Sequence, residues 1–156
     1  MKEYFHRLFS FNDWANKSII GCLIENNVRH EQIIKLTSHL LHAQHNWYKR
    51  LVNQQNDTPV WEVLPLEQML AYSDKNTQQW LNYLQLHDEN DFKRVISYFN
   101  LKGLHCSNEI QDILTHVVNH STYHRGQVAL FIREHGFAPP STDQIMYATL
   151  FSKTFE

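Results

Sequence analysis

Three histidines at a spacing of four residues, His116, His120 and His124, are the side chains with the clearest potential for chemistry. They lie in the stretch 116–127, which has the apolar spacing of a helix. Residues four apart lie about one turn apart on the same side of a helix, so two neighbouring imidazoles of this set can bind one metal ion. Whether they do so depends on the elements that surround them.

Length and composition indicate a folded globular protein. The 156 residues suit one domain, which we expect to span 1–156, and 42% of them are hydrophobic, with nine Phe, seven Tyr and four Trp. Histidine is over-represented, with 11 in the chain. The net charge of −2 is spread without a basic stripe, which argues against nucleic acid or an anionic membrane as a partner.

The two cysteines, Cys22 and Cys106, are far apart and show neither a C-x-x-C spacing nor a disulfide framework. We interpret them as buried thiols in a reducing compartment. The N-terminus lacks the apolar region of a signal peptide, and no run approaches the ~18 apolar residues of a membrane span. The chain is therefore expected to be a cytoplasmic protein.

The periodicity of the sequence predicts a mainly helical protein. Apolar residues recur every three to four positions in four long segments, at about 2–26, 30–54, 65–84 and 108–135. Because four amphipathic helices need a common core, the predicted class is all-α, a four-helix bundle. The short first link predicts that the first two helices are antiparallel neighbours, whereas the later links are long enough to cross the bundle.

The segment before the last long helix has a different pattern. Residues 92–106 are rich in β-branched and aromatic side chains, with turn chemistry at 100–103, which predicts a short β-hairpin. Asn108 and Gln111 have the form of a capping box for the helix that follows. A last short helix is expected through 145–150.

The rotation of the last long helix decides where its histidines point. At about 100° per residue, its apolar positions define one face, with His124 near the middle, His120 on the edge and His116 towards the polar flank. A core-facing imidazole must satisfy both nitrogens, through hydrogen bonds or a metal ion. Satisfied core histidines and metal ligands are both open interpretations at this point.

The second helix supplies another cluster, His39, His42 and His45. His39 flanks the apolar stripe, while His42 and His45 turn progressively outward, so His39 is the best third ligand. Three imidazoles suit a divalent ion such as Zn, Ni or Fe, and they leave coordination positions for water or substrate, as in catalytic sites.

Other patterns carry less chemistry. The residues between His120 and His124 are Ser, Thr and Tyr, so the general-base Glu of the H-E-x-x-H zinc protease helix is absent. Ser121 points about 100° away from His120 and does not form a Ser/His pair with it. Arg125 and Gln127 are interpreted as polar positions of the helix surface, with a hydrogen bond from Gln127 to a ligand as the alternative.

Several motifs, taken in order along the chain, resemble one family. The stretch 116–127, followed by 136–143, closely resembles the C-terminal signature of the DinB-like proteins, part of the DinB/YfiT superfamily of candidate metalloenzymes. Residues 11–16 resemble the family's first-helix segment, and 36–51 resemble its second-helix segment with His, Trp and Arg. The resemblance covers nearly the whole chain and is weakest in its middle.

This resemblance implies an up-down-down-up bundle and a metal site formed by His39, His120 and His124. It implies that His116 is not a ligand, and His42, one turn after His39, is the alternative on the second helix. Related proteins include transferases and isomerases that use mycothiol or bacillithiol, and proteins considered to be metal-dependent hydrolases. Family members often pair, so the resemblance also implies a homodimer.

The leading hypothesis is a metal-dependent enzyme with an open three-histidine site, in which a low-molecular-weight thiol or water attacks a small electrophilic substrate. A thiol-dependent S-transferase is the first candidate activity, and a metal-dependent hydrolase is the alternative. A non-catalytic metal-binding protein of a stress response is the rival from another class. The sequence assigns no catalytic base.

Overall fold

The computed structural model describes residues 1–56 and 58–151, and four long helices dominate it. These are α1 (Lys2–Glu25), α2 (Glu31–Leu51), α3 (Leu66–Leu86) and α5 (Ile110–Glu134). The shorter elements are α4 (Glu89–Phe92), β1 (Val95–Phe99), β2 (His105–Glu109) and α6 (Gln144–Phe151). The predicted all-α class, with a hairpin before the last long helix, is confirmed. No helix in the described part of the chain is long and apolar enough to cross a membrane.

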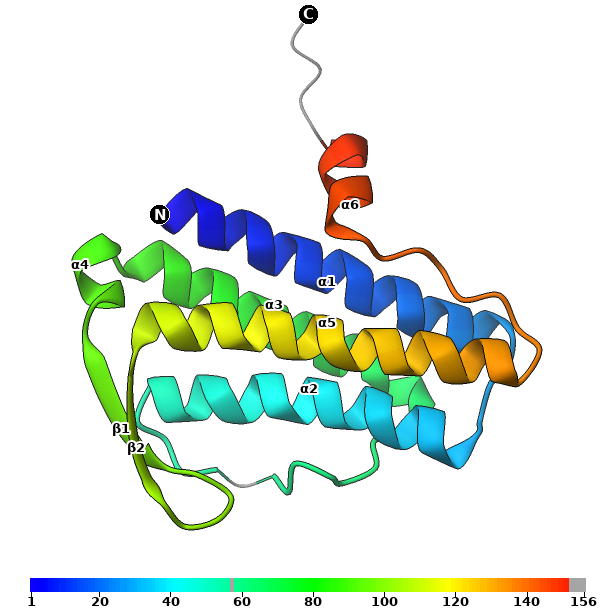
Figure 1. The fold of residues 1–156 in the computed structure, drawn as a ribbon, viewed down its shortest axis with the longest axis horizontal. Coiled ribbons are helices and arrows are strands. Elements are labelled where there is room, and N and C mark those ends of the chain that lie inside the picture. The colour runs from blue at the N-terminus through cyan, green and yellow to red at the C-terminus, as the bar shows by residue number, and fades with distance from the viewer. Residues whose placement is uncertain (57, 152–156) are drawn as a thin grey trace, which may run out of the picture.

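The four long helices run up, down, down and up, as Figure 1 shows. Residues 52–56 and 58–65 lie along the length of the bundle, so α3 starts at the same end as α2 and runs parallel to it. Both α1 and α2 pack mainly against α3 and α5. The first two helices are antiparallel, as predicted. The prediction that they are neighbours is wrong, because the chain places α3 between them and leaves them on a diagonal.

The core consists of two apolar clusters separated along the bundle by a polar layer. One cluster contains the N-terminal half of α1 and the first turns of α5. The other contains the C-terminal half of α1 and the last turns of α5. Buried polar side chains from α1, α2 and α5 fill the layer between them, including Asn12, Asn16, Gln44, Ser121, His124 and Arg125. Such groups are tolerated in a core only when they find partners.

Arg125 is the centre of this polar layer, with only 1% of its surface exposed, so its interpretation as a surface residue is wrong. Its Nη1 donates to the side-chain oxygens of Asn12 at 2.6 Å and Asn16 at 2.8 Å. Both amides in turn donate to Gln44 Oε1 at 3.4 Å. Trp80 Nε1 of α3 donates to the backbone carbonyl oxygen of Gln44 at 3.3 Å. One network therefore ties all four long helices together.

The hairpin leads directly into α5. Its strands pair antiparallel, with Ile96 opposite Asn108, and Glu109 is both the last residue of β2 and the N-cap of α5. The predicted capping box is wrong, because Asn108 is a strand residue whose Oδ1 accepts from Tyr98 at 2.8 Å. A real capping box precedes the hairpin, where Asp88 caps the short helix α4.

Candidate metal centre

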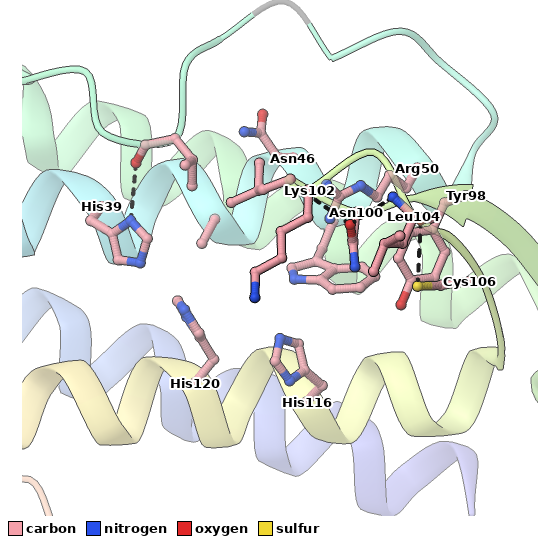
Figure 2. Close-up of a pocket in the computed structure, with 14 residues that line it drawn as sticks. His39, Asn46, Arg50, Tyr98, Asn100, Lys102, Leu104, Cys106, His116 and His120 are labelled. Carbon is pink, nitrogen blue, oxygen red and sulfur yellow. Dashed lines mark hydrogen bonds between the residues drawn. The ribbon is translucent and has the colours of Figure 1, made fainter.

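His39 lies in the middle of α2 and is fixed by the loop that follows that helix. Its Nδ1 donates to the carbonyl oxygen of Val60 at 3.1 Å. The ring of Trp61 stacks on the His39 imidazole, with centroids 3.7 Å apart and planes 12° apart. A proton on Nδ1 leaves Nε2 with a free lone pair, and Figure 2 shows this side of the ring facing α5 and His120.

His120 and His124 extend from successive turns of α5 towards His39. His124 is 9% exposed, and its Nδ1 donates to Gln127 Oε1 at 2.7 Å, which is possible because residues three apart face the same side of a helix. The hydrogen bond considered for Gln127 is thus present. It fixes the tautomer of His124 with Nε2 unprotonated, as the Val60 carbonyl does for His39.

The three imidazoles gather around one point between α2 and α5. One nitrogen from each of His39, His120 and His124 lies within 4.8 Å of the other two. The ring centroids are 4.5 Å apart for the two residues of α5, and 4.6 and 5.2 Å apart across the helices. Nitrogens that share one tetrahedral zinc ion lie roughly 3.4 Å apart, so small side-chain rotations are sufficient to close the set.

The environment keeps these imidazoles neutral. Burial, with repulsion from His124, His39 and His116, lowers the pKa of His120 to about 3. Burial also lowers the pKa of His39 and of His124, although the hydrogen bonds to Val60 and Gln127 act to raise these values. Neutral imidazole is the form that binds metal ions. The donor set therefore fits a divalent ion at pH 7.

These low pKa values predict how the stability of the metal-free protein depends on pH. His120 titrates near 6.5 when unfolded and near 3 when folded, so between these values the unfolded chain binds the proton more readily. The free energy of unfolding should be highest above pH 6.5 and fall as the pH drops towards 3. Urea denaturation at several pH values should show a shallower fall for His120→Asn; an unchanged slope would contradict this.

The other histidines of the two clusters lie elsewhere. His42 and His45 are buried, so the prediction that they turn outward is wrong. Both face α3, where the Tyr72 hydroxyl lies 3.1 Å from His42 Nδ1 and the rings of His45 and Tyr72 are 5.7 Å apart. The helix that packs on this side of α2 buries them. His116 is exposed, as its position on the polar flank predicted, and stays outside the group of three.

A pocket opens beside His39 and His120 and extends towards the hairpin, as Figure 2 shows. Its volume is about 470 Å³, and residues of α2, α5 and the hairpin line it together with Val60. His39 and His120 form one end. Cys106, predicted to be buried, is only partly buried and lines the pocket wall. This wall could not be predicted from the residue pattern, because it depends on how the hairpin packs beside α2.

The fold and the histidine cluster describe a helical bundle with a candidate metal site, and comparison with known proteins agrees. Residues 7–152 match the DinB family, so the chain belongs to that family. The protein of Bacillus subtilis (strain 168) named Protein DinB is 23% identical to it over 167 aligned positions. The alignment covers 94% of this chain and 95% of that protein. The resemblance seen in the sequence is confirmed.

Proposed function

We propose that this protein binds one divalent metal ion through His39, His120 and His124 and uses it in an enzymatic reaction. The observation that carries the proposal is the meeting of three neutral imidazoles from two helices at the end of a pocket. Membership of the DinB family supports a metal-binding role. With three protein ligands, zinc, nickel or iron would keep at least one position for another molecule.

The chain's own residues supply the rest of the arrangement. The Val60 carbonyl and Gln127 orient two of the ligands, and Trp61 covers His39 from solvent. The bound ion supplies a Lewis acid that lowers the pKa of a thiol or a water molecule. The pocket is large enough to hold a small electrophile beside that position.

Thiol transfer is the activity that we favour. In this reaction a low-molecular-weight thiol loses its proton to solvent, its sulfur forms a bond to the electrophilic carbon, and the leaving group departs with the bonding electron pair. A thiolate is a strong nucleophile once formed and needs no carboxylate base. None of the described residues that line the pocket is Asp or Glu, which agrees with this choice.

Metal-dependent hydrolysis is the second candidate, and His116 is the observation that favours it. This imidazole lines the pocket with its ring 5.5 Å from that of His120. The loss of hydration where the ring faces the pocket, together with repulsion from Arg50, lowers its pKa, so it is a neutral base at pH 7. Such a base can take a proton from an attacking water. His116→Gln should abolish hydrolysis of an ester but leave thiol transfer largely intact.

A reaction panel tests the proposed activity. Protein reconstituted with zinc, nickel or iron is mixed with bacillithiol, mycothiol or cysteine and the electrophile chlorodinitrobenzene, and with p-nitrophenyl acetate in parallel. We expect metal-dependent thioether formation that His120→Ala eliminates. Ester hydrolysis alone would favour the second candidate. Bound metal without either reaction would favour a non-catalytic metal-binding protein.

The single domain, the cytoplasmic location and the homodimer stay predictions.

The hydrogen bond to Gln127 predicts a specific loss of metal affinity. Gln127→Leu leaves all three candidate ligands in place but removes the acceptor that orients His124. Loss of such an outer partner weakens metal binding by about 10–100-fold. Gln111→Leu is the matched control, since Gln111 lies in the first turn of the same helix and its side-chain amide donates to Glu109 at 2.6 Å. Competition with a chromogenic chelator measures both, and equal affinities would contradict the role of Gln127.

A further inference from the structure

Arg50 stands out at the end of the pocket that lies away from the histidines, as Figure 2 shows. Its guanidinium carbon lies 4.6 Å from the ring centroid of Trp47 and 5.3 Å from that of Tyr98. The side chain is partly buried, and burial lowers its pKa without removing the charge. No carboxylate among the described residues pairs with it. A partly desolvated cation is thus held open towards the pocket.

A second cation enters the same pocket from the hairpin turn. Asn100 Oδ1 accepts from the backbone nitrogens of Lys102 and Leu104, at 2.9 and 3.0 Å, and so shapes the turn. In Figure 2 the Lys102 side chain extends into the space between Arg50 and His120. The pocket therefore has two cationic side chains and, among its described lining residues, no acidic one.

We propose that the pocket binds a small organic anion, with a carboxylate or phosphate at Arg50 and its other end directed at the three histidines. A guanidinium offers paired donors that match either group, and an anion offsets the cost of the unpaired charge. Trp47, Ala43 and Val60 provide apolar surface for the body of the ligand. The direction of the reacting end rests on the proposed function, whereas the anion site rests on Arg50 itself.

Such a site would serve as a positioning device. Arg50 and His39 lie at opposite ends of the pocket in Figure 2, so an anion held by the arginine fixes which part of the molecule meets the histidines. Holding a reactant in one orientation lowers the entropic part of a reaction barrier. The positive charge of Lys102 adds electrostatic attraction for the anion, and its flexible stem lets the ammonium move with the ligand.

Three matched probes test the anion site: 3-phenylpropionate, its neutral amide, and phenethyl phosphate. Their affinities are measured by tryptophan fluorescence and calorimetry for both metal-free and zinc-loaded protein. We expect at least one anion to bind about tenfold more tightly than the amide, as a charge-assisted hydrogen bond provides. The stronger anion identifies the ligand as a carboxylate or a phosphate. Arg50→Gln should abolish the preference, and Arg133→Gln, at an exposed position of α5, should keep it.

Two results would overturn the proposal: equal affinities of amide and anions in the wild type, or an unchanged preference in Arg50→Gln. If that variant does not fold by circular dichroism, the Arg50 side-chain ¹⁵Nε resonance in wild-type protein decides, since it should shift with an anion and not with the amide. The metal-free measurement separates the two proposals. An Arg50-dependent preference in a protein that binds none of zinc, nickel and iron would support the anion site and contradict the proposed function.

Discussion

The double variant His120→Ala/His124→Ala is expected to lose its metal, with affinity lower by a thousandfold or more. If a zinc site with four ligands provides about 10–16 kcal/mol, each ligand contributes about 3 kcal/mol, and two of the three imidazoles are removed here. The remaining His39 has no partner on α5. Elemental analysis after purification and chelator competition should show about one ion per wild-type chain and a background level in the variant.

A matched pair of histidines at the end of the bundle provides the control. The rings of His30 and His135 are 3.9 Å apart and both residues are exposed, outside the group of three. The variant His30→Ala/His135→Ala removes as many imidazoles and should keep its metal. His42→Ala should keep it as well, which tests the alternative third ligand. Retention of metal by the first double variant would show that these histidines do not form the site.

Arg125→Met is expected to reduce the free energy of unfolding by about 2–5 kcal/mol. The substitution leaves the side-chain oxygens of Asn12 and Asn16 without their donor inside the core, and an unsatisfied buried acceptor costs about 1–3 kcal/mol. For a protein of this size the melting temperature should fall by about 10 °C. Arg133→Met, at an exposed position of the same helix, should change it little.

A quadruple variant separates the hydrogen bonds from general damage. In Asn12→Leu/Asn16→Leu/Gln44→Met/Arg125→Met the linked donors and acceptors are removed together. Replacing a whole buried polar group by apolar residues is often close to neutral. The quadruple variant should therefore be more stable than Arg125→Met alone. A single variant as stable as the wild type would contradict the role given to this network.

The positions of the site histidines on α5 could be predicted because they depend on local geometry. The rotation per residue in a helix is fixed, so the apolar spacing alone placed His124 in the core and His116 outside it. The third position needed a second helix. His39 flanks an apolar stripe, which predicts it as the third ligand, and the structure brings it to the two residues of α5.

The residues wrongly predicted to lie at the surface are those whose burial depends on more than one neighbouring helix. A bundle helix contacts two others, so its buried arc is wider than its apolar stripe. Arg125 lies one residue beyond His124 and faces the asparagines of α1, and His42 faces Tyr72 of α3. Polar residues in such positions look like surface residues in a sequence. Only the packed helices show that they have partners.

The pocket wall could not be predicted either. The aromatic run at 92–99 indicated a strand. The short helix α4 that precedes the strand, with its capping box of Asp88 and Asp91, was therefore not predicted. The hairpin itself was predicted, but its packing beside α2 is a long-range arrangement. For this reason Arg50, Tyr98 and Lys102 emerge as neighbours only in the structure.

The identity of the ligands is tested most directly by the anomalous signal of the bound ion in a crystal of the metal-loaded protein. We predict one ion between α2 and α5, bound by nitrogens of His39, His120 and His124 at about 2.0–2.1 Å for zinc, with an open position facing the pocket. An ion bound instead by His42 or His116, or a metal-treated crystal with no ion at these three residues, would contradict the proposed site.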